Sequence, residues 1–416
     1  MRRQLVSFGL VSLLALAACT GGSGTPVLTW YTNPDDGGQE AIAQACTEEA
    51  DGEYRINVST LPREASSQRE QLARRLAAED SSIDIMSLDP PFIPEFAEPG
   101  FLAEVPEELQ DTDGIVQGSV ESATWNEELV AVPFWANPQL LWYRTSVVED
   151  LDLDMDKVTW EELIEAAKDN DLFIGVQGAK EESLTVWINA LTASAGGEIV
   201  TAGADKSDEI ELGLDSDEGR KAAEIISEIG KEGLAGAGLP TADENASMNL
   251  FQGDKGAFMV NWPFVWSAIG AANEDLLDDI GWAMYPRVDE DTESAPPVGG
   301  INLGVSAFSK NTDLAYEAVK CIVQPEHQTE YFLTDGNPPS AKEAYDDDEV
   351  KEEFPMSDLI RDSLDAAAPR PQSPFYNEIS LGLQNTWHPP GAVNPDITPK
   401  ASNDYITQVL RGEKLL

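Results

Sequence analysis

The 416-residue sequence has only two histidines, His327 and His388, and neither lies in a His-Glu-x-x-His motif. This scarcity argues against histidine-based metal sites and Ser-His-Asp triads, because both need imidazole at defined positions. The sequence also lacks a Gly-x-x-x-x-Gly-Lys-[Ser/Thr] loop and a Gly-x-Gly-x-x-Gly pattern after a strand. We therefore expect no metal and no cofactor, although abundant carboxylates leave a glycosidase-type carboxylate pair open.

Basic residues are scarce as well. Lys and Arg number 26 against 76 Asp and Glu, and the formal net charge is −50. This balance argues against nucleic acid as a partner and against protein-mediated docking on anionic lipid. We interpret the acidic excess as a solvated, salt-adapted or solubility-tuned surface. Calcium binding is the alternative, but no Asp-x-[Asp/Asn]-x-[Asp/Asn]-Gly loop with a distal Glu occurs.

No apolar run reaches the ~20 residues of a membrane-spanning helix. The run that follows Arg2 and Arg3 is short and ends in small residues before Cys19. This order predicts a lipoprotein signal peptide over residues 1–18, followed by a lipidated flexible tether over 19–26. The mature chain would then be anchored by lipid at the extracellular face of the cytoplasmic membrane. The alternative is an ordinary signal peptide with a coincidental cysteine.

Only three cysteines are present. If Cys19 carries lipid, Cys46 and Cys321 remain, and in an exported chain they suggest one disulfide. Such a bond would close a long loop, contribute ~3–5 kcal/mol and require both cysteines to share a domain. Two buried free thiols are the alternative.

The N-terminal part alternates between strand and helix signals. The predicted strands and helices cover residues 27–32, 38–50, 54–61, 66–79 and 83–88. This β-α-β-α-β order predicts a parallel, doubly wound sheet, and the chain length predicts two domains. The extended segment 128–144 contains two prolines, which suits a crossing between the domains.

Polar residues follow each of the three predicted strands. They are Asn33, Asp35, Asp36, Pro62, Arg63 and Asp89. Since ligands of such sheets bind beyond the carboxyl ends of strands, these residues predict a site for a small polar ligand. The alternative for residues 35–38 is that they turn the chain and cap the next helix.

Ten tryptophans are a large number for this length. A tryptophan face packs on the apolar face of a sugar, while Asp, Asn, Gln and Arg bind its hydroxyls. Trp262 lies at a predicted strand end before a proline, so we expect it to contact a ligand. The alternative is core packing, which we expect for Trp142 and Trp266.

Several segments resemble the extracellular solute-binding proteins of sugar importers (family 1), and more narrowly the actinobacterial trehalose-binding lipoproteins of the LpqY type. The segments are residues 71–76, 83–86, 96–102, 137–144, 260–265 and 299–303. Cys46 and Cys321 also lie where that group has cysteines. The sequence departs from the group in the short stretch 266–282 and in the loop containing Pro34.

The resemblance implies an α/β, two-lobe periplasmic-binding-protein-like fold, with hinge-crossing segments and a ligand cleft between the lobes. The N-terminal lobe would comprise residues 27–136 and 283–324, and the C-terminal lobe 137–282 and 325–416. By position, the residues implied to line the cleft are Asp89, Asn137, Trp262, Gly300 and Arg370, with Asn33, Asp36 and Gln68 as weaker matches.

In this interpretation Asp89 accepts hydrogen bonds from sugar hydroxyls, Arg370 donates them, and Asn137 does both. Trp262 stacks on a ring, and Gly300 brings backbone close to it. The chain would be no enzyme but a monomeric binding protein that delivers a disaccharide, trehalose first, to the permease of an ABC importer. The alternatives are a binder of maltose or glucosides, a secreted carbohydrate-active enzyme, and a lipoprotein that contacts proteins or wall polymer.

Overall fold

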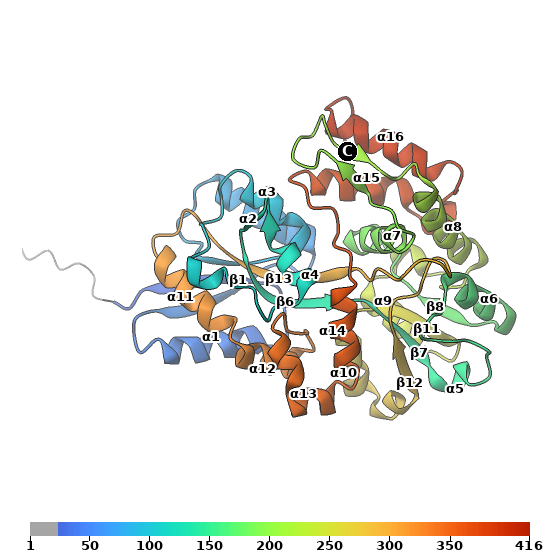
Figure 1. The fold of residues 1–416 in the computed structure, drawn as a ribbon, viewed down its shortest axis with the longest axis horizontal. Coiled ribbons are helices and arrows are strands. Elements are labelled where there is room, and N and C mark those ends of the chain that lie inside the picture. Colours follow the sequence, from blue (N-terminus) through green and yellow to red (C-terminus); the bar gives the residue numbers. More distant parts are fainter. Residues whose placement is uncertain (1–23) are drawn as a thin grey trace, which may run out of the picture.

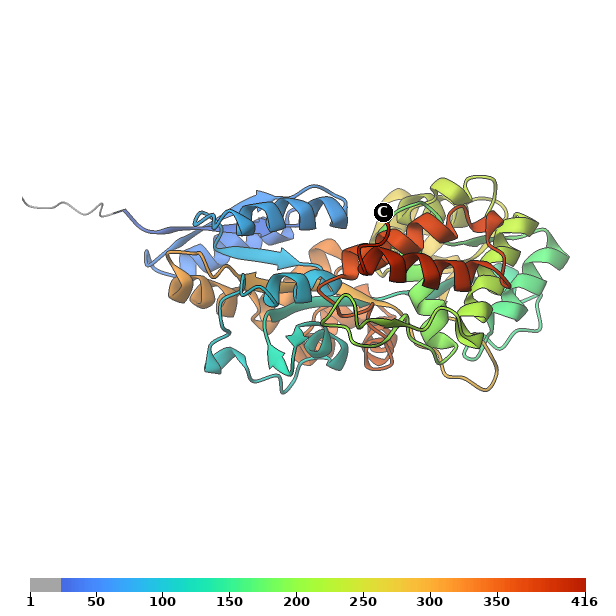
Figure 2. The same ribbon diagram turned by 90° about the horizontal axis from the view of Figure 1, so that it is seen from above.

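The computed structural model describes residues 24–416, which form two α/β lobes lying side by side (Figure 1 and Figure 2). The first lobe contains a five-stranded sheet in the order β2-β1-β3-β13-β6. Its strands are β1 (Val27–Thr32), β2 (Arg55–Thr60), β3 (Ile85–Leu88), β6 (Val132–Pro138) and β13 (Val298–Val305). β1 pairs in parallel with β2 and β3, as predicted, whereas β13 is antiparallel to β3 and β6.

The second lobe contains a four-stranded sheet in the order β12-β7-β11-β8. Its strands are β7 (Leu140–Arg144), β8 (Phe173–Gly175), β11 (Gly256–Asn261) and β12 (Ile280–Ala283). β11 is parallel to β8 and antiparallel to β7. Two small hairpins lie outside the sheets: β4 (Thr124–Trp125) with β5 (Glu128–Leu129), and β9 (Val200–Ala202) with β10 (Glu211–Leu212).

The helices of the first lobe bury one face each, as α11 (Thr312–Ile322) does with Tyr316, Val319 and Ile322. These helices are α1 (Gly38–Glu49), α2 (Ala65–Ala77), α3 (Ile93–Ala97), α4 (Gln117–Ser122), α11 and α12 (Pro325–Asp335). In α2, Leu72 and Leu76 lie four residues apart and are both buried, so one face of the helix enters the core.

The second lobe holds most of the longer helices. They are α5 (Thr145–Val148), α6 (Trp160–Asn170), α7 (Glu182–Ser194), α8 (Asp217–Glu232), α9 (Glu244–Phe251), α10 (Phe264–Ala272), α15 (Tyr376–Trp387) and α16 (Thr398–Leu410). Local sequence sets their ends. Thr159 and Glu162 form a capping box at the start of α6, and Gly233 ends α8 in the left-handed conformation.

The chain crosses between the lobes three times. The crossings lie between β6 and β7, between β12 and β13, and between α14 (Ser357–Asp365) and α15. The first confirms the predicted crossing within residues 128–144. A shared core supports these crossings, since Ala136 of β6, Trp142 of β7 and Ile360 of α14 belong to one buried cluster, beside α13 (Asp348–Glu353).

The predicted lobe boundaries stay a prediction. The structure adds that α12, which the prediction assigns to the C-terminal lobe, packs against α1 and α11 of the first lobe. Within residues 24–416, no helix combines the length and the apolar composition that a membrane crossing requires. The predicted signal peptide and the lipidated Cys19 lie outside the described residues.

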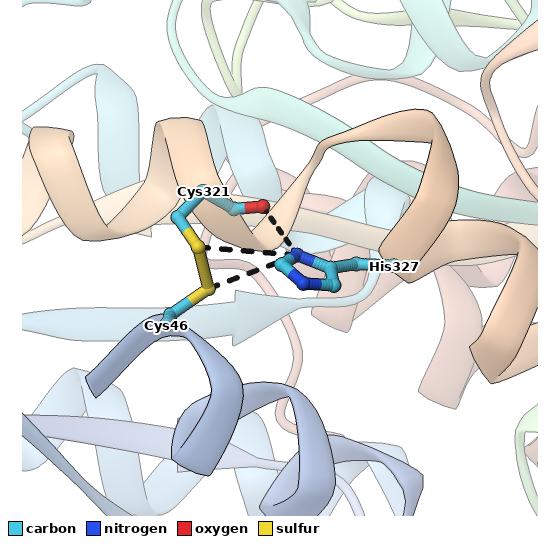
Figure 3. Close-up of side chains that lie close together, drawn as sticks. All are labelled: Cys46, Cys321 and His327. Atoms are coloured by element: carbon cyan, nitrogen blue, oxygen red, sulfur yellow. Dashed lines mark hydrogen bonds between the residues drawn. A yellow bond between two sulfur atoms is a disulfide. The ribbon is translucent and has the colours of Figure 1, made fainter. Parts of the chain in front are cut away.

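A disulfide joins Cys46 of α1 to Cys321 of α11, which confirms the predicted pairing within one lobe. His327 of α12 lies beside both sulfur atoms, and its Nδ1 donates to the Cys321 carbonyl at 2.8 Å (Figure 3). Among the described residues, these three form a group of possible metal ligands, with ligand atoms within 4.8 Å of one another. Because both sulfurs are bonded to each other, they are not thiolates and do not offer a metal site.

Candidate functional site

A cavity of about 560 Å³ lies between the two lobes. Loops that follow β1, β2 and β3 line it from the first lobe, and the starts of α7, α9 and α10 line it from the second. All the residues predicted from the sequence to bind ligand lie on its wall: Asn33, Asp36, Gln68, Asp89, Asn137, Trp262, Gly300 and Arg370. The folding of the chain thus brings residues up to 337 positions apart into one cleft.

In the loop after β1, Asp35 caps the next helix, and Asn33 has a side-chain oxygen without a hydrogen-bond partner in the described chain. Asp35 accepts hydrogen bonds from the backbone N–H groups of Gly37 and Gln39, so the capping alternative is correct for this residue. The backbone N–H of Asp36 donates to Asp335 Oδ1 at 2.7 Å. Asn33 Oδ1 is buried without a hydrogen-bond partner among the described residues, and it is therefore open to a ligand donor.

Gln68 supports the loop after β2. Its Nε2 donates to the carbonyls of Pro62 at 2.8 Å and Arg63 at 3.3 Å. The residue is buried, at 8% exposed, so most of its side chain is committed to packing and to these bonds. Its main contribution to the cleft is therefore to fix the position of this loop.

Arg370 is paired with protein carboxylates. Its Nη2 donates to Asp89 Oδ1 at 2.6 Å, and its Nη1 donates to Glu182 Oε1 at 2.7 Å. Burial alone would lower the pKa of Arg370, but the neighbouring Asp89, Tyr376 and Glu182 raise it, and the guanidinium stays charged. The buried Nε has no hydrogen-bond partner among the described residues.

The base of the cleft joins β13, β6 and the end of β11. Gly299 pairs with Asn137, and a Cβ at Gly299 would lie 2.7 Å from Asn137 Oδ1 and 3.3 Å from the Trp262 ring. Gly300 has a φ of 133° and leaves no room for a Cβ, which would lie 2.3 Å from the Trp135 carbonyl oxygen. The glycine pair therefore lets strand backbone reach the cleft floor beside the Trp262 ring.

Trp142 and Trp266 pack against protein, as expected. Trp142 is fully buried, and its Nε1 donates to the Asn261 carbonyl at 3.0 Å. Trp266 packs edge-on against Trp282 and donates to the Glu353 carbonyl, away from the cavity wall. Both are therefore structural, while Trp262 is half-buried and lines the cavity.

The sequence reasoning missed four acidic residues of the second lobe. They are Glu181, Glu182, Asp243 and Glu244. Burial, with help from Glu181 and Asp243, raises the pKa of Glu244 to about 7. A usable signal existed for the first two, because they follow strand β8 and the rule of carboxyl strand ends applies to both lobes.

The cavity wall is strongly acidic. Nine of its residues are Asp or Glu, whereas Arg63 and Arg370 are its only basic residues among the described chain. Carboxylates accept hydrogen bonds, so the wall suits a ligand rich in hydroxyl donors and disfavours an anion. The aromatic rings of Trp135, Trp262 and Phe264 add apolar faces.

Comparisons with known proteins agree with this geometry. A family model described as bacterial extracellular solute-binding protein matches residues 41–356. A probable ABC transporter-binding protein of Deinococcus radiodurans is 25% identical over 86% of this chain and 85% of its own length. A galactooligosaccharide-binding protein of Bacillus subtilis is 21% identical over 96% of this chain and 94% of its own length.

A solved structure of maltose-bound MalE3 from T. maritima matches with a TM-score of 0.78 at 24% identity, over 93% of this chain and all of that one. This confirms the predicted two-lobe fold. The family and the structural neighbours are solute-binding proteins, so the comparisons also support the prediction that the chain is not an enzyme. The chain belongs to the bacterial extracellular solute-binding proteins.

Proposed function

We propose that this chain captures a disaccharide, trehalose first, outside the cytoplasmic membrane and delivers it to the permease of an ABC importer. The observation that carries the proposal is the inter-lobe cavity, whose wall combines many carboxylates with the half-buried Trp262 ring. Its volume of about 560 Å³ falls within the range of roughly 300–1,000 Å³ of small-molecule sites. The names of the relatives, as ABC transporter-binding and galactooligosaccharide-binding proteins, support an importer of sugars.

Binding would divide between the two lobes. Asp89 and Asn137 face the sugar from the first lobe, and Trp262 stacks on a ring from the second. Asn137 suits this role because no described protein group bonds to its side-chain amide, which leaves both donor and acceptor free. A hinge motion at the three crossings would close the two lobes around the sugar, with α12 moving with the first lobe, against whose α1 and α11 it packs.

The identity of the sugar rests on the resemblance of segments such as 137–144 and 260–265 to trehalose-binding lipoproteins. Another di- or oligosaccharide is the second candidate. The maltose in the matching MalE3 structure and the name of the Bacillus subtilis relative favour it. Both candidate ligands are rich in hydroxyl groups, which the carboxylates of the cavity wall can bind.

The proposal includes a lipid anchor at Cys19 and a monomeric protein. The anchor would hold the captured sugar near its permease and so raise the effective concentration there. A Cys19→Ser variant should release the protein from cells while leaving sugar binding in vitro unchanged. Equal sugar uptake with the released form would show that delivery does not need the anchor.

A thermal-shift screen, followed by calorimetry of any hit, tests the function. The panel contains trehalose, maltose, sucrose, cellobiose and a galactooligosaccharide. We expect trehalose to raise the Tm most, since a ligand that binds only the folded state stabilises it. A larger shift with maltose or with the galactooligosaccharide would support the second candidate, and no shift with any sugar would refute the proposal.

A further inference from the structure

Arg370 occupies a special place in the fold, because it lies in the third crossing between the lobes, between α14 and α15. Its side chain is only 4% exposed. An arginine this buried needs carboxylate partners, since an unpaired buried charge is very costly. Here one partner comes from each lobe: Asp89 follows β3 of the first, and Glu182 begins α7 of the second.

The two partners are held very differently. Glu182 Oε1 also accepts from the Tyr376 hydroxyl, and Oε2 accepts from Ser380 Oγ at 2.7 Å. Ser380 is itself bonded to Gln384 Nε2 at 3.0 Å. Glu182 is thus fixed within the second lobe by α15. The Asp89 carboxylate, by contrast, bonds to Arg370 alone among the described side chains.

Because Glu182 is held by several bonds and Asp89 by one, the Arg370–Asp89 bond is the contact that can change when the lobes move. Arg370 and Glu182 form a unit anchored in the second lobe, and the single 2.6 Å bond from Nη2 to Asp89 reaches across the cleft. A hinge motion would break or remake that bond, together with the edge-to-face contact between Phe92 and Tyr376 of α15, and leave the bonds of Glu182 intact. The Nε atom is buried and has no partner among the described residues, and Arg370 lines the cavity.

We propose that Glu182 is a positioning residue of the cleft, which aims the Arg370 guanidinium at Asp89. The resulting Arg370–Asp89 bond links the lobes before ligand arrives, and the same orientation of the guanidinium presents its Nε to the ligand. The part that concerns ligand rests on the proposed function. The link between the lobes does not, since it concerns the unliganded protein. Neutralising either carboxylate should therefore loosen the cleft without any ligand being present.

The test compares three variants by small-angle X-ray scattering of the unliganded protein and by calorimetry with trehalose. Glu182→Gln and Asp89→Asn should each increase the radius of gyration, because each removes one half of the bridge. Glu182→Gln should also weaken trehalose binding by about tenfold or more, because Arg370 loses its charged hydrogen bond. Asp279→Asn is the matched control, since it breaks the Arg144–Asp279 pair within the second lobe alone.

We expect the control to keep the wild-type scattering and affinity even where its Tm falls. A Glu182→Gln protein with lower Tm but unchanged scattering and affinity would overturn the proposal, because Glu182 would then be a merely structural residue. If Glu182→Gln does not fold, the scattering of Asp89→Asn decides the link. If no sugar binds the wild type, the proposed function fails, and the scattering still tests the link.

Discussion

Trp262 and Trp142 look alike in the sequence but differ in their surroundings. Trp142 is fully buried and surrounded by protein, whereas Trp262 is half-buried and lines the cavity beside Gly299. The difference follows from position, because Trp142 sits inside β7 and Trp262 follows the last residue of β11. Trp142 therefore belongs to the core, whereas Trp262 is placed to contact a ligand.

We expect Trp262→Ala to weaken sugar binding and to leave the unliganded Tm within about 2 °C of wild type. Loss of ~2 kcal/mol of apolar contact with a sugar ring corresponds to about a 30-fold increase in Kd. Calorimetric titration and thermal unfolding measure the two effects. Trp142→Ala is the control and should lose about 3–5 kcal/mol of folding free energy. Normal affinity with a large loss of Tm in Trp262→Ala would place that ring in the core.

Glu244 predicts a dependence of stability on pH. Its pKa is raised to about 7 in the folded state from an ordinary value of 4.5. The folded protein therefore binds a proton that the unfolded chain releases, and this group destabilises the fold above pH 7 and ceases to do so below about pH 4.5. Since the side chain is only partly buried, we expect about 1–2 kcal/mol.

Denaturant unfolding of the wild type and Glu244→Gln at pH 8, 6 and 5 measures this effect. The variant should be more stable than wild type at pH 8, and the difference should shrink toward pH 5. Asp335, with a pKa raised to about 6 by burial and by Asp35 and Asp36, contributes in the same direction in both proteins. A difference that grows as the pH falls would contradict the prediction.

The predictability of the site was uneven for a physical reason. The residues after β1 and β3, such as Asn33 and Asp89, follow from a rule about strand ends that needs only local signals. The pairing of Arg370 with Asp89 and Glu182 joins three distant parts of the chain, and no local pattern encodes it. The sequence thus predicted several of the residues that face the cleft, but neither the four acidic residues of the second lobe nor which residues bond to one another.

At the scale of elements, the first five elements of the chain (β1, α1, β2, α2 and β3) form close to where the periodicity of apolar residues predicts them. The predicted helix over 66–79 is α2 at Ala65–Ala77, and the predicted strand over 27–32 is β1. The antiparallel insertion of β13 between β3 and β6 was not predictable, because its partners lie at least 160 residues upstream. Periodicity fixes an element's type, whereas its neighbours depend on tertiary packing.

The disulfide between α1 and α11 closes a loop with a sequence separation of 275 residues. We expect the double variant Cys46→Ser, Cys321→Ser to lose about 3–5 kcal/mol of folding free energy, because the unfolded chain regains entropy. Guanidinium unfolding with and without dithiothreitol measures the loss. Reductant should lower the midpoint of the wild type toward that of the variant and leave the variant unchanged. A variant as stable as the oxidised wild type would contradict this expectation.

At the scale of the whole molecule, two sheets of different topology share one cleft because the chain crosses between them three times. The buried cluster containing Ala136, Trp142 and Ile360 joins the lobes at these crossings. The Arg370 bridge supplies a second, polar connection inside the cleft. The molecule therefore combines an apolar joint that persists with a charged contact that can be broken and remade.

The net charge of −50 predicts that salt stabilises the whole molecule. Like charges repel in the compact state, and salt shortens the screening length from about 10 Å at 0.1 M to about 3 Å at 1 M. Salt also weakens ion pairs such as Lys168–Glu228, but exposed pairs contribute little. We expect the Tm to rise by about 2–4 °C between 0.05 and 1 M KCl, since a gain of ~1 kcal/mol corresponds to a shift of this size in domains of this length.

A variant with Glu107→Lys and Glu108→Lys provides the control. Both glutamates are exposed at the surface, and the change makes the net charge less negative without touching the cleft. Its Tm should therefore rise less with KCl than that of the wild type, while its sugar affinity stays the same. A wild-type Tm that falls with KCl would mean that attraction between paired charges outweighs the general repulsion, and the acidic surface would then stabilise the fold through its ion pairs.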